Sequence, residues 1–135
     1  MLAVVDSGPL YATLDCDDDD HTASVQVLER EGLRLIIPVL VVAEVSYLAS
    51  TRLGADVEAE FITGLTELDV DAPPPAEWAR IAELIQRYAD FPLGAADASV
   101  VTLAERVQTP YVITLDHRHF HAVRPKHCAA LELLP

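Results

Sequence analysis

Short apolar runs alternate with helix-length segments along the whole chain, and this pattern limits the folds that the chain can adopt. The run at 2–5 is apolar on both faces, as in a strand that is buried in a sheet, and the runs at 33–37 and 111–114 are further short strand candidates. Segments between them, such as 39–52 and 95–107, carry apolar residues at helical spacing. Strands that alternate with helices predict an α/β domain with a mainly parallel sheet between two helical layers.

No repeat or low-complexity linker divides the sequence, so residues 1–135 are expected to form a single domain. No apolar run reaches the roughly 20 residues that a membrane helix requires, and the N-terminus lacks the pattern of a signal peptide. With only Cys16 and Cys128, the chain has no disulfide framework. We therefore expect a cytoplasmic protein. The expected strands are 2–5, 33–37, 67–70, 111–114 and 130–134, and the expected helices are 8–14, 21–30, 39–52, 55–65, 95–107 and a segment from Trp78 to Tyr88.

Four acidic residues stand in apolar surroundings, where a charge is costly unless something compensates it. Asp6 and Asp116 follow apolar strands, and Glu44 and Asp97 lie within apolar helices. In a parallel sheet, ligands bind beyond the carboxyl ends of the strands, which is where Asp6 and Asp116 are expected. The two helical carboxylates follow strands or loops, so all four are expected to lean into the same crevice.

Carboxylate oxygens are the ligands that magnesium and manganese prefer, so four of them suit one or two such ions. Two carboxylates about 5 Å apart repel by roughly 3 kcal/mol at an effective dielectric of about 20, so at least one should hold its proton unusually tightly without metal. The hydroxyls of Ser7 and Thr114 are candidates for orienting a ligand or a water. Purely structural interpretations remain open: a helix cap for Asp6, an exposed position for Glu44, a helix N-terminus for Asp97 and a turn for Asp116.

The charge of the chain is distributed unevenly. The net charge is −13, which argues against a general nucleic-acid-binding protein. Residues 1–100 contain 5 basic and 19 acidic side chains, whereas residues 101–135 contain 4 basic and 3 acidic ones and four of the five histidines. Only the segment 117–127 would attract a phosphate backbone, and a solvated loop is its alternative interpretation. RNA binding is therefore expected to be weak and salt-sensitive unless divalent ions are present.

Four motifs together give the sequence a family resemblance: Val4–Leu10 around Asp6, Pro38–Val45 around Glu44, Leu93–Arg106 around Asp97, and Val112–Phe120 around Asp116. In this order and spacing they resemble the PIN-domain ribonucleases, in particular the VapC toxins of bacterial VapBC toxin–antitoxin pairs. The resemblance implies a three-layer α/β/α fold with a five-stranded sheet.

The same resemblance implies a Mg²⁺- or Mn²⁺-dependent endoribonuclease that cleaves structured RNA, such as transfer or ribosomal RNA, and so inhibits translation and growth. It matches Asp6, Glu44, Asp97 and Asp116 to the four acidic residues of the family, and Thr114 to a hydroxyl that often precedes the fourth. It also implies a homodimer and a cognate VapB-type antitoxin whose C-terminal tail fills the site.

Three other interpretations remain open. A phosphotransfer enzyme with Asp6 as nucleophile would need an acidic residue two positions later and a nearby lysine, but position 8 is glycine and Lys126 is the only lysine. A receiver-like binding module would need an acidic pair beside its first strand, and this sequence lacks that pair. The third alternative is a PIN-like protein that has kept the fold and lost the activity. The run Asp17–Asp20 exceeds the family pattern; we expect a solvated loop whose last aspartate caps the next helix.

Overall fold

The computed structural model describes all of residues 1–135, which form an α/β fold around one five-stranded sheet. The strand order is β3-β2-β1-β4-β5, and every neighbouring pair is parallel. The strands are β1 (Leu2–Val5), β2 (Arg34–Pro38), β3 (Asp69–Asp71), β4 (Tyr111–Ile113) and β5 (Glu132–Leu134). The helices are α1 (Ser7–Leu14), α2 (His21–Leu28), α3 (Val39–Arg52), α4 (Ala55–Gly64), α5 (Glu77–Arg87), α6 (Ala95–Val107) and α7 (His117–Ala122).

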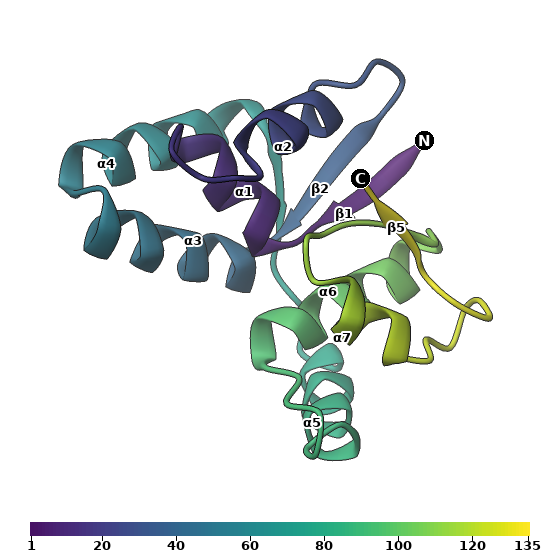
Figure 1. Ribbon diagram of the computed structural model, residues 1–135. Helices are drawn as coiled ribbons and strands as arrows, with labels where there is room; N and C mark the ends of the chain where they lie inside the picture. The colour runs from purple at the N-terminus through teal and green to yellow at the C-terminus, as the bar shows by residue number, and fades with distance from the viewer.

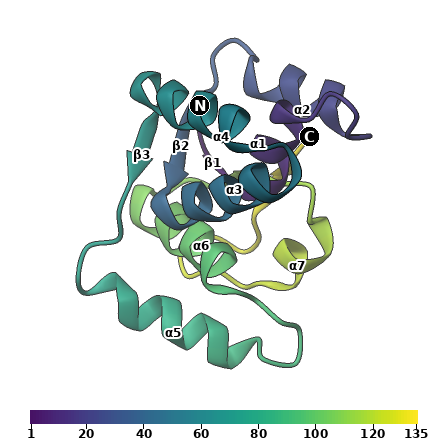
Figure 2. The same ribbon diagram turned by 90° about the vertical axis from the view of Figure 1, so that its left-hand side faces the viewer.

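Helices cover both faces of the sheet, which confirms the predicted three layers (Figures 1 and 2). Helices α1, α2 and α4 lie on one side, and α5, α6 and α7 lie on the other. Helix α3 starts where β2 ends and extends with α4 beyond the carboxyl edge of the sheet. Helix α6 packs against β1, β2 and β4, so the first turn of α6 is held close to the carboxyl ends of the central strands.

The core extends over both faces of the sheet, and β1 and α6 form its most deeply buried part. Ala3, Val4 and Val5 are completely buried, as are most side chains of α6 between Ala98 and Ala104. Burial of each large apolar side chain contributes roughly 1.5–3 kcal/mol, so this packing holds the two elements in register. A Leu103→Ala substitution would leave a cavity in α6 and cost about 2–5 kcal/mol of stability.

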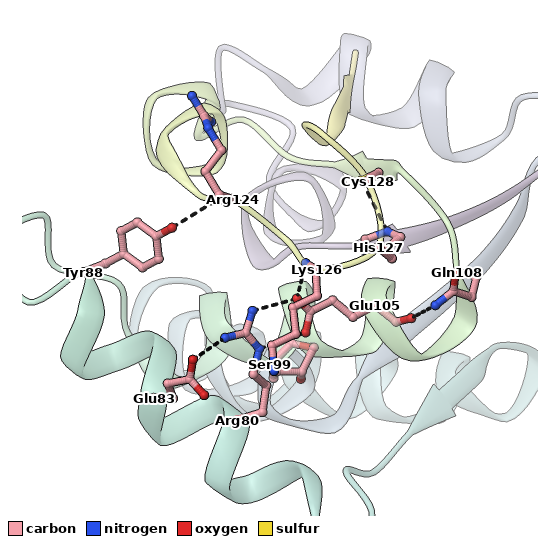
Figure 3. A network of polar contacts seen from close by, with 11 residues as sticks. Arg80, Glu83, Tyr88, Ser99, Glu105, Gln108, Arg124, Lys126, His127 and Cys128 are labelled. Atoms are coloured by element: carbon pink, nitrogen blue, oxygen red, sulfur yellow. Dashed lines mark hydrogen bonds and ion pairs between the residues drawn. The ribbon is translucent and has the colours of Figure 1, made fainter.

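A network of ion pairs joins α5 to α6 on the outer side of the fold (Figure 3). The Arg80 guanidinium donates from Nε and Nη2 to the two carboxylate oxygens of Glu105, at 3.0 and 2.8 Å. Its Nη1 pairs with Glu83 at 2.9 Å. The backbone N–H of Lys126 also donates to Glu105, at 2.8 Å. We call Arg80, Glu83, Glu105 and the Lys126 backbone the α5–α6 network.

The structure differs from the sequence-based expectations at the short elements. Segment 117–127, for which a loop was one interpretation, begins with the helix α7, whose basic and histidine side chains give no apolar period. Strand β3 begins two residues later than expected, because its pairing with Ile36–Pro38 sets its position. Helix α2 ends at Leu28 instead of residue 30, and Leu65–Glu67 forms a 3-10 turn after α4.

Two further features concern expectations about the bulk of the chain. Cys16 and Cys128 are both free thiols. None of the helices has the length and apolar character that crossing a lipid bilayer would require.

Candidate active site

Asp6 lies at the carboxyl end of β1, and its side chain is only 4% exposed. Its backbone N–H donates to the Ile113 carbonyl at 2.9 Å, which fixes the end of β1 beside β4. One carboxylate oxygen, Oδ2, accepts a hydrogen bond of 2.8 Å from the Thr114 hydroxyl. The other, Oδ1, is buried without any hydrogen-bond partner. Asp6 occupies the N-cap position of α1 but its side chain caps nothing, so helix capping does not explain it.

The pKa of Asp6 is raised to about 6. Burial is the largest cause; hydrogen bonds from the Ser7 backbone and Thr114 oppose it, and the negative charges of Asp97 and Glu44 raise the pKa further. The expectation that one carboxylate holds its proton tightly is confirmed in direction. The main reason is desolvation, because β1 buries Asp6 more deeply than the other three acidic residues.

Asp97 lies in the first turn of α6 and is half-buried. Its Oδ2 accepts a hydrogen bond of 3.2 Å from the Gly94 backbone N–H, so it does serve the helix N-terminus. The pKa of Asp97 is nevertheless raised, because the effect of burial exceeds that of the Gly94 hydrogen bond, which lowers it. The charges of Glu44 and Asp116 raise the pKa further. Asp97 therefore has both Glu44 and Asp116 as electrostatic neighbours.

Asp116 is the N-cap of α7, and His119 engages both of its carboxylate oxygens. The His119 backbone N–H donates to Oδ1 at 3.2 Å, and the His119 ring Nδ1 lies within hydrogen-bond distance of Oδ2. The Asp116 backbone N–H donates in turn to the Thr114 hydroxyl oxygen at 2.9 Å. Thr114 thus links the two strand-end carboxylates, since its hydroxyl donates to Asp6 and accepts from Asp116.

The four predicted carboxylates gather at the carboxyl edge of the sheet, but their settings differ from the expectation. Only Asp6 is buried; Asp97 and Asp116 are partly exposed, and Glu44 is exposed on α3. The expectation that all four charges stand in apolar surroundings is therefore wrong for Glu44, which faces solvent from a half-buried helix. As the side chains are arranged, no three acidic, histidine or cysteine side chains are close enough together to hold a metal ion.

The supporting residues and the acidic run also have defined places. Thr114 is fully buried and bonded as described, whereas Ser7 affects Asp6 only through its backbone, which lowers the pKa of that carboxyl. Asp20 stands at the N-cap position of α2 without a side-chain cap, so the expected capping bond is absent. Asp15, just before the run, accepts from the backbone N–H of Asp17, and Asp18 accepts from that of Asp20, as in ordinary turns.

Sequence reasoning did not single out His119 and Phe91, which complete this edge. The rings of Phe91 and His119 are 4.7 Å apart between centroids, and Arg118 lies over Phe91 at 5.1 Å. The signal in the sequence was the spacing of His119 three residues after Asp116, which on a helix turns both side chains to one face. The contact with Phe91, in the loop before α6, could not be read from that spacing.

The only lysine belongs to a different part of the molecule. The Lys126 backbone bonds Glu105 at the C-terminal end of α6, and its charge acts on the same carboxylate. Asp97 is in the first turn of that helix, so eight residues, or about 12 Å, separate the two ends. A pocket of about 340 Å³ lies beside Lys126, but its arginines are already ion-paired. Neither a nearby lysine nor an acidic residue two positions after Asp6, where Gly8 stands, therefore supports Asp6 as a phosphoryl acceptor.

Comparison with known proteins places the chain among proteins of this architecture. The PIN domain family model matches residues 3–125. Ribonuclease VapC26 of Mycobacterium tuberculosis strain H37Rv is 35% identical over 124 residues, which cover 90% of this chain and 92% of that protein.

Two solved structures have a similar fold. VapC20 of Mycobacterium tuberculosis, described as a Sarcin–Ricin loop cleaving toxin, has a TM-score of 0.79 at 15% identity, over 88% of this chain and 92% of its own. VapBC2 of Rickettsia felis, bound to a DNA fragment from its promoter, has a TM-score of 0.70 at 16% identity over the whole of both chains. At such low identity these two likenesses concern the fold alone.

Proposed function

The chain belongs to the PIN-domain family, within its VapC ribonucleases, and from this membership we propose that it is a metal-dependent endoribonuclease. It is an RNA-cleaving hydrolase of the toxin type, like the relatives that it matches. The single observation that carries the metal dependence is Asp6, a buried carboxylate with one unpartnered oxygen among the charges of other carboxylates. A cation bound at Oδ1 would offset both the lost hydration and the repulsion.

The side chains at this edge offer the ligand atoms that a hard divalent ion prefers, and three of them would have to move closer together to hold it. Asp6, Glu44, Asp97 and Asp116 offer only oxygen atoms, which Mg²⁺ and Mn²⁺ prefer. When bound there, such an ion supplies a water of lowered pKa and neutralises charge that builds up on the phosphate. We propose these four side chains as its ligands.

The chain's own residues have separate tasks. The Thr114 hydroxyl holds Asp6 at Oδ2 and leaves Oδ1 free for a cation or a proton. Since the pKa of Asp6 is raised to about 6, loss of that proton near neutral pH prepares Oδ1 for a ligand role. The contact of His119 with both oxygens of Asp116 fixes the direction of the fourth carboxylate. Glu44, exposed on α3, approaches from the side that is open to solvent.

We propose a structured RNA, such as transfer or ribosomal RNA, as the substrate, so the protein would act in the cytoplasm. VapC20 is described as cleaving the Sarcin–Ricin loop, which supports this class of substrate. The acidic body of the protein supports the need for divalent ions, because a net charge of −13 repels a phosphate backbone.

We further propose a homodimer and a VapB-type antitoxin as partners. VapBC2, which has a similar fold, carries a name that joins a VapB to a VapC, and this supports a VapB-type partner. Exposed apolar side chains on α3 and α4, Tyr47 at 67% and Ile62 at 45% exposure, support contacts with other proteins on that part of the surface. The antitoxin tail is proposed to fill the site, where a basic side chain would meet the carboxylates.

The test is cleavage of purified RNA in Mg²⁺ or Mn²⁺ and in chelator. The unaltered protein should cleave only with divalent ion, and Asp6→Asn should be inactive. Asp56→Asn is the matched control, because Asp56 is an exposed aspartate on α4 outside the site. Full cleavage in chelator would refute the metal dependence. A folded protein that cleaves no RNA would instead favour a PIN-like binding module without activity.

A further inference from the structure

The basic part of the chain is concentrated on and after α7. Residues 117–127 contain Arg118, Arg124 and Lys126, four histidines and no acidic residue. The ion pairs of the protein involve Arg34, Arg80, Arg106 and His119, so Arg118 and Arg124 have no carboxylate partner. The charges of Arg118 and Arg124 are therefore not compensated by an ion pair, on a chain with 22 acidic residues.

The loop between α5 and α6 packs against this helix and adds aromatic side chains. The Arg118 guanidinium lies over the Phe91 ring at 5.1 Å from its centroid, and Phe91 contacts the His119 ring. The Arg124 backbone N–H donates to the Tyr88 hydroxyl at 2.9 Å, as Figure 3 shows. We call residues 88–91 and 117–124 the α7 rim.

The α7 rim adjoins the candidate active site directly. His119 contacts Phe91 on one side and the Asp116 carboxylate on the other. His119 is also an electrostatic neighbour of Asp97 and acts to lower the pKa of that carboxyl. A polymer bound along the rim would therefore pass beside the carboxylates.

We propose that the α7 rim binds single-stranded RNA next to the scissile phosphate, with Arg118 as its main contact. This inference rests on the proposed function and assigns residues to substrate binding at the same site. A planar guanidinium supported by an aromatic ring can stack on a base and donate to a phosphate, and both interactions tolerate any sequence. Arg124 donates from Nη1 to the carbonyls of His121 and Val123, which fixes its guanidinium beside the end of α7.

Arg52 provides a matched control for Arg118. It is also exposed and also lies over an aromatic ring, Tyr11, at 5.2 Å. The Tyr11 hydroxyl, however, donates to Asp15, so the surroundings of Arg52 are acidic. Substitution of either arginine removes one charge and one cation–aromatic contact. The two substitutions differ in whether the arginine lies on the α7 rim.

The experiment measures fluorescence anisotropy of a labelled single-stranded RNA of about 12 nucleotides, in Mg²⁺, with all variants in an Asp97→Asn background that prevents cleavage. Arg118→Gln should raise Kd about tenfold and reduce the slope of log Kd against log salt by about 0.7. Arg118→Lys should restore the slope but not the full affinity, because it keeps the charge and loses the planar contact. Arg52→Gln should leave Kd within about twofold.

Equal effects of Arg118→Gln and Arg52→Gln, or no effect of either, would overturn the inference. The inference would also be overturned if Arg118→Gln left RNA binding unchanged and weakened the binding of an acidic peptide. That result would assign the rim to a protein partner. Cleavage with Asp97 intact separates the two proposals: Arg118→Gln should raise KM and leave kcat within about twofold. If the unaltered protein cleaves no RNA but its binding depends on Arg118, the proposed function fails and the rim assignment stands.

Discussion

Helix α6 carries a carboxylate near each end, and the two behave in opposite ways. Asp97 lies in the first turn, where the helix dipole favours a negative charge, and Glu105 lies near the C-terminus, where the dipole disfavours it. Yet the pKa of Asp97 is raised and that of Glu105 is lowered. Burial raises the pKa of both, but hydrogen bonds from Arg80 and Lys126 outweigh it at Glu105.

The comparison teaches that neighbours decide the role of a carboxylate more than its place on the helix does. Glu105 meets a bidentate arginine and a backbone N–H, so its charge is compensated within the protein and joins α5 to α6. Asp97 meets Glu44 and Asp116 instead, so its charge needs a compensating cation from outside. The first arrangement stabilises the fold, and the second suits a binding site.

The largest expected effect is on catalysis. Asp97→Asn should reduce kcat/KM for RNA cleavage by at least about a hundredfold, because it removes a proposed ligand. Glu105→Gln should leave cleavage within about twofold, since its contacts lie at the other end of α6. Initial rates in Mg²⁺ measure both. Comparable losses of activity in the two folded variants would contradict the division of roles.

The pH dependence of stability should next separate the candidate site, through Asp6, from the α5–α6 network. Asp6 has a pKa of about 6 when folded and 3.8 as its ordinary value, so the folded state binds more protons between these pH values. The free energy of unfolding contributed by Asp6 therefore falls as pH rises from about 4 to 6, by about 3 kcal/mol. Urea unfolding of the unaltered protein and of Asp6→Asn in chelator, compared across this range, measures the difference.

Glu105 should give the opposite sign in the same measurement. Its pKa is lowered on folding, so its contribution is present above the ordinary pKa of 4.5 and is lost as pH falls. The difference between the unaltered protein and Glu105→Gln should therefore shrink toward acidic pH. Parallel pH profiles for Asp6→Asn and Glu105→Gln would show that the candidate site and the α5–α6 network do not differ in this way.

Breaking the α5–α6 network should destabilise the fold without affecting chemistry. Arg80→Ala removes the partner of Glu105, whose side chain is 12% exposed, and should cost about 2 kcal/mol. Urea denaturation gives the loss of stability, and cleavage assays below the unfolding transition should show little change in kcat. Arg34→Ala is the control, because its pair with Asp69 is exposed and should contribute less than about 1 kcal/mol.

The smallest expected effect is the response of stability to divalent ions. At about ten times Kd, Mg²⁺ or Mn²⁺ should stabilise the folded state by about 1.4 kcal/mol and raise Tm by roughly 4 °C. Asp6→Asn should lose most of this shift, whereas Glu105→Gln should keep it. An identical shift in Asp6→Asn would place the ion elsewhere on the protein.

The amino-acid sequence by itself determined the layered fold and the four acidic positions. The apolar runs of β1 and β4 are local patterns, and the comparisons confirm the PIN-domain resemblance that the motifs around Asp6 and Asp97 suggested. The short elements were harder to predict from the sequence, because neither shows an apolar period. Helix α7 is held by its Asp116 cap, and β3 is held by its pairing with β2.

Only the tertiary structure decided how strongly each charge is perturbed. Thr114 and Asp6 are 108 positions apart in sequence, and Arg80 and Glu105 are 25 apart, yet each pair shares hydrogen bonds. Burial and hydrogen bonding depend on every element that packs around a group, so no local pattern could separate buried Asp6 from exposed Glu44. The sequence supplied the carboxylates, and long-range packing determined which of them has a buried oxygen without a hydrogen-bond partner.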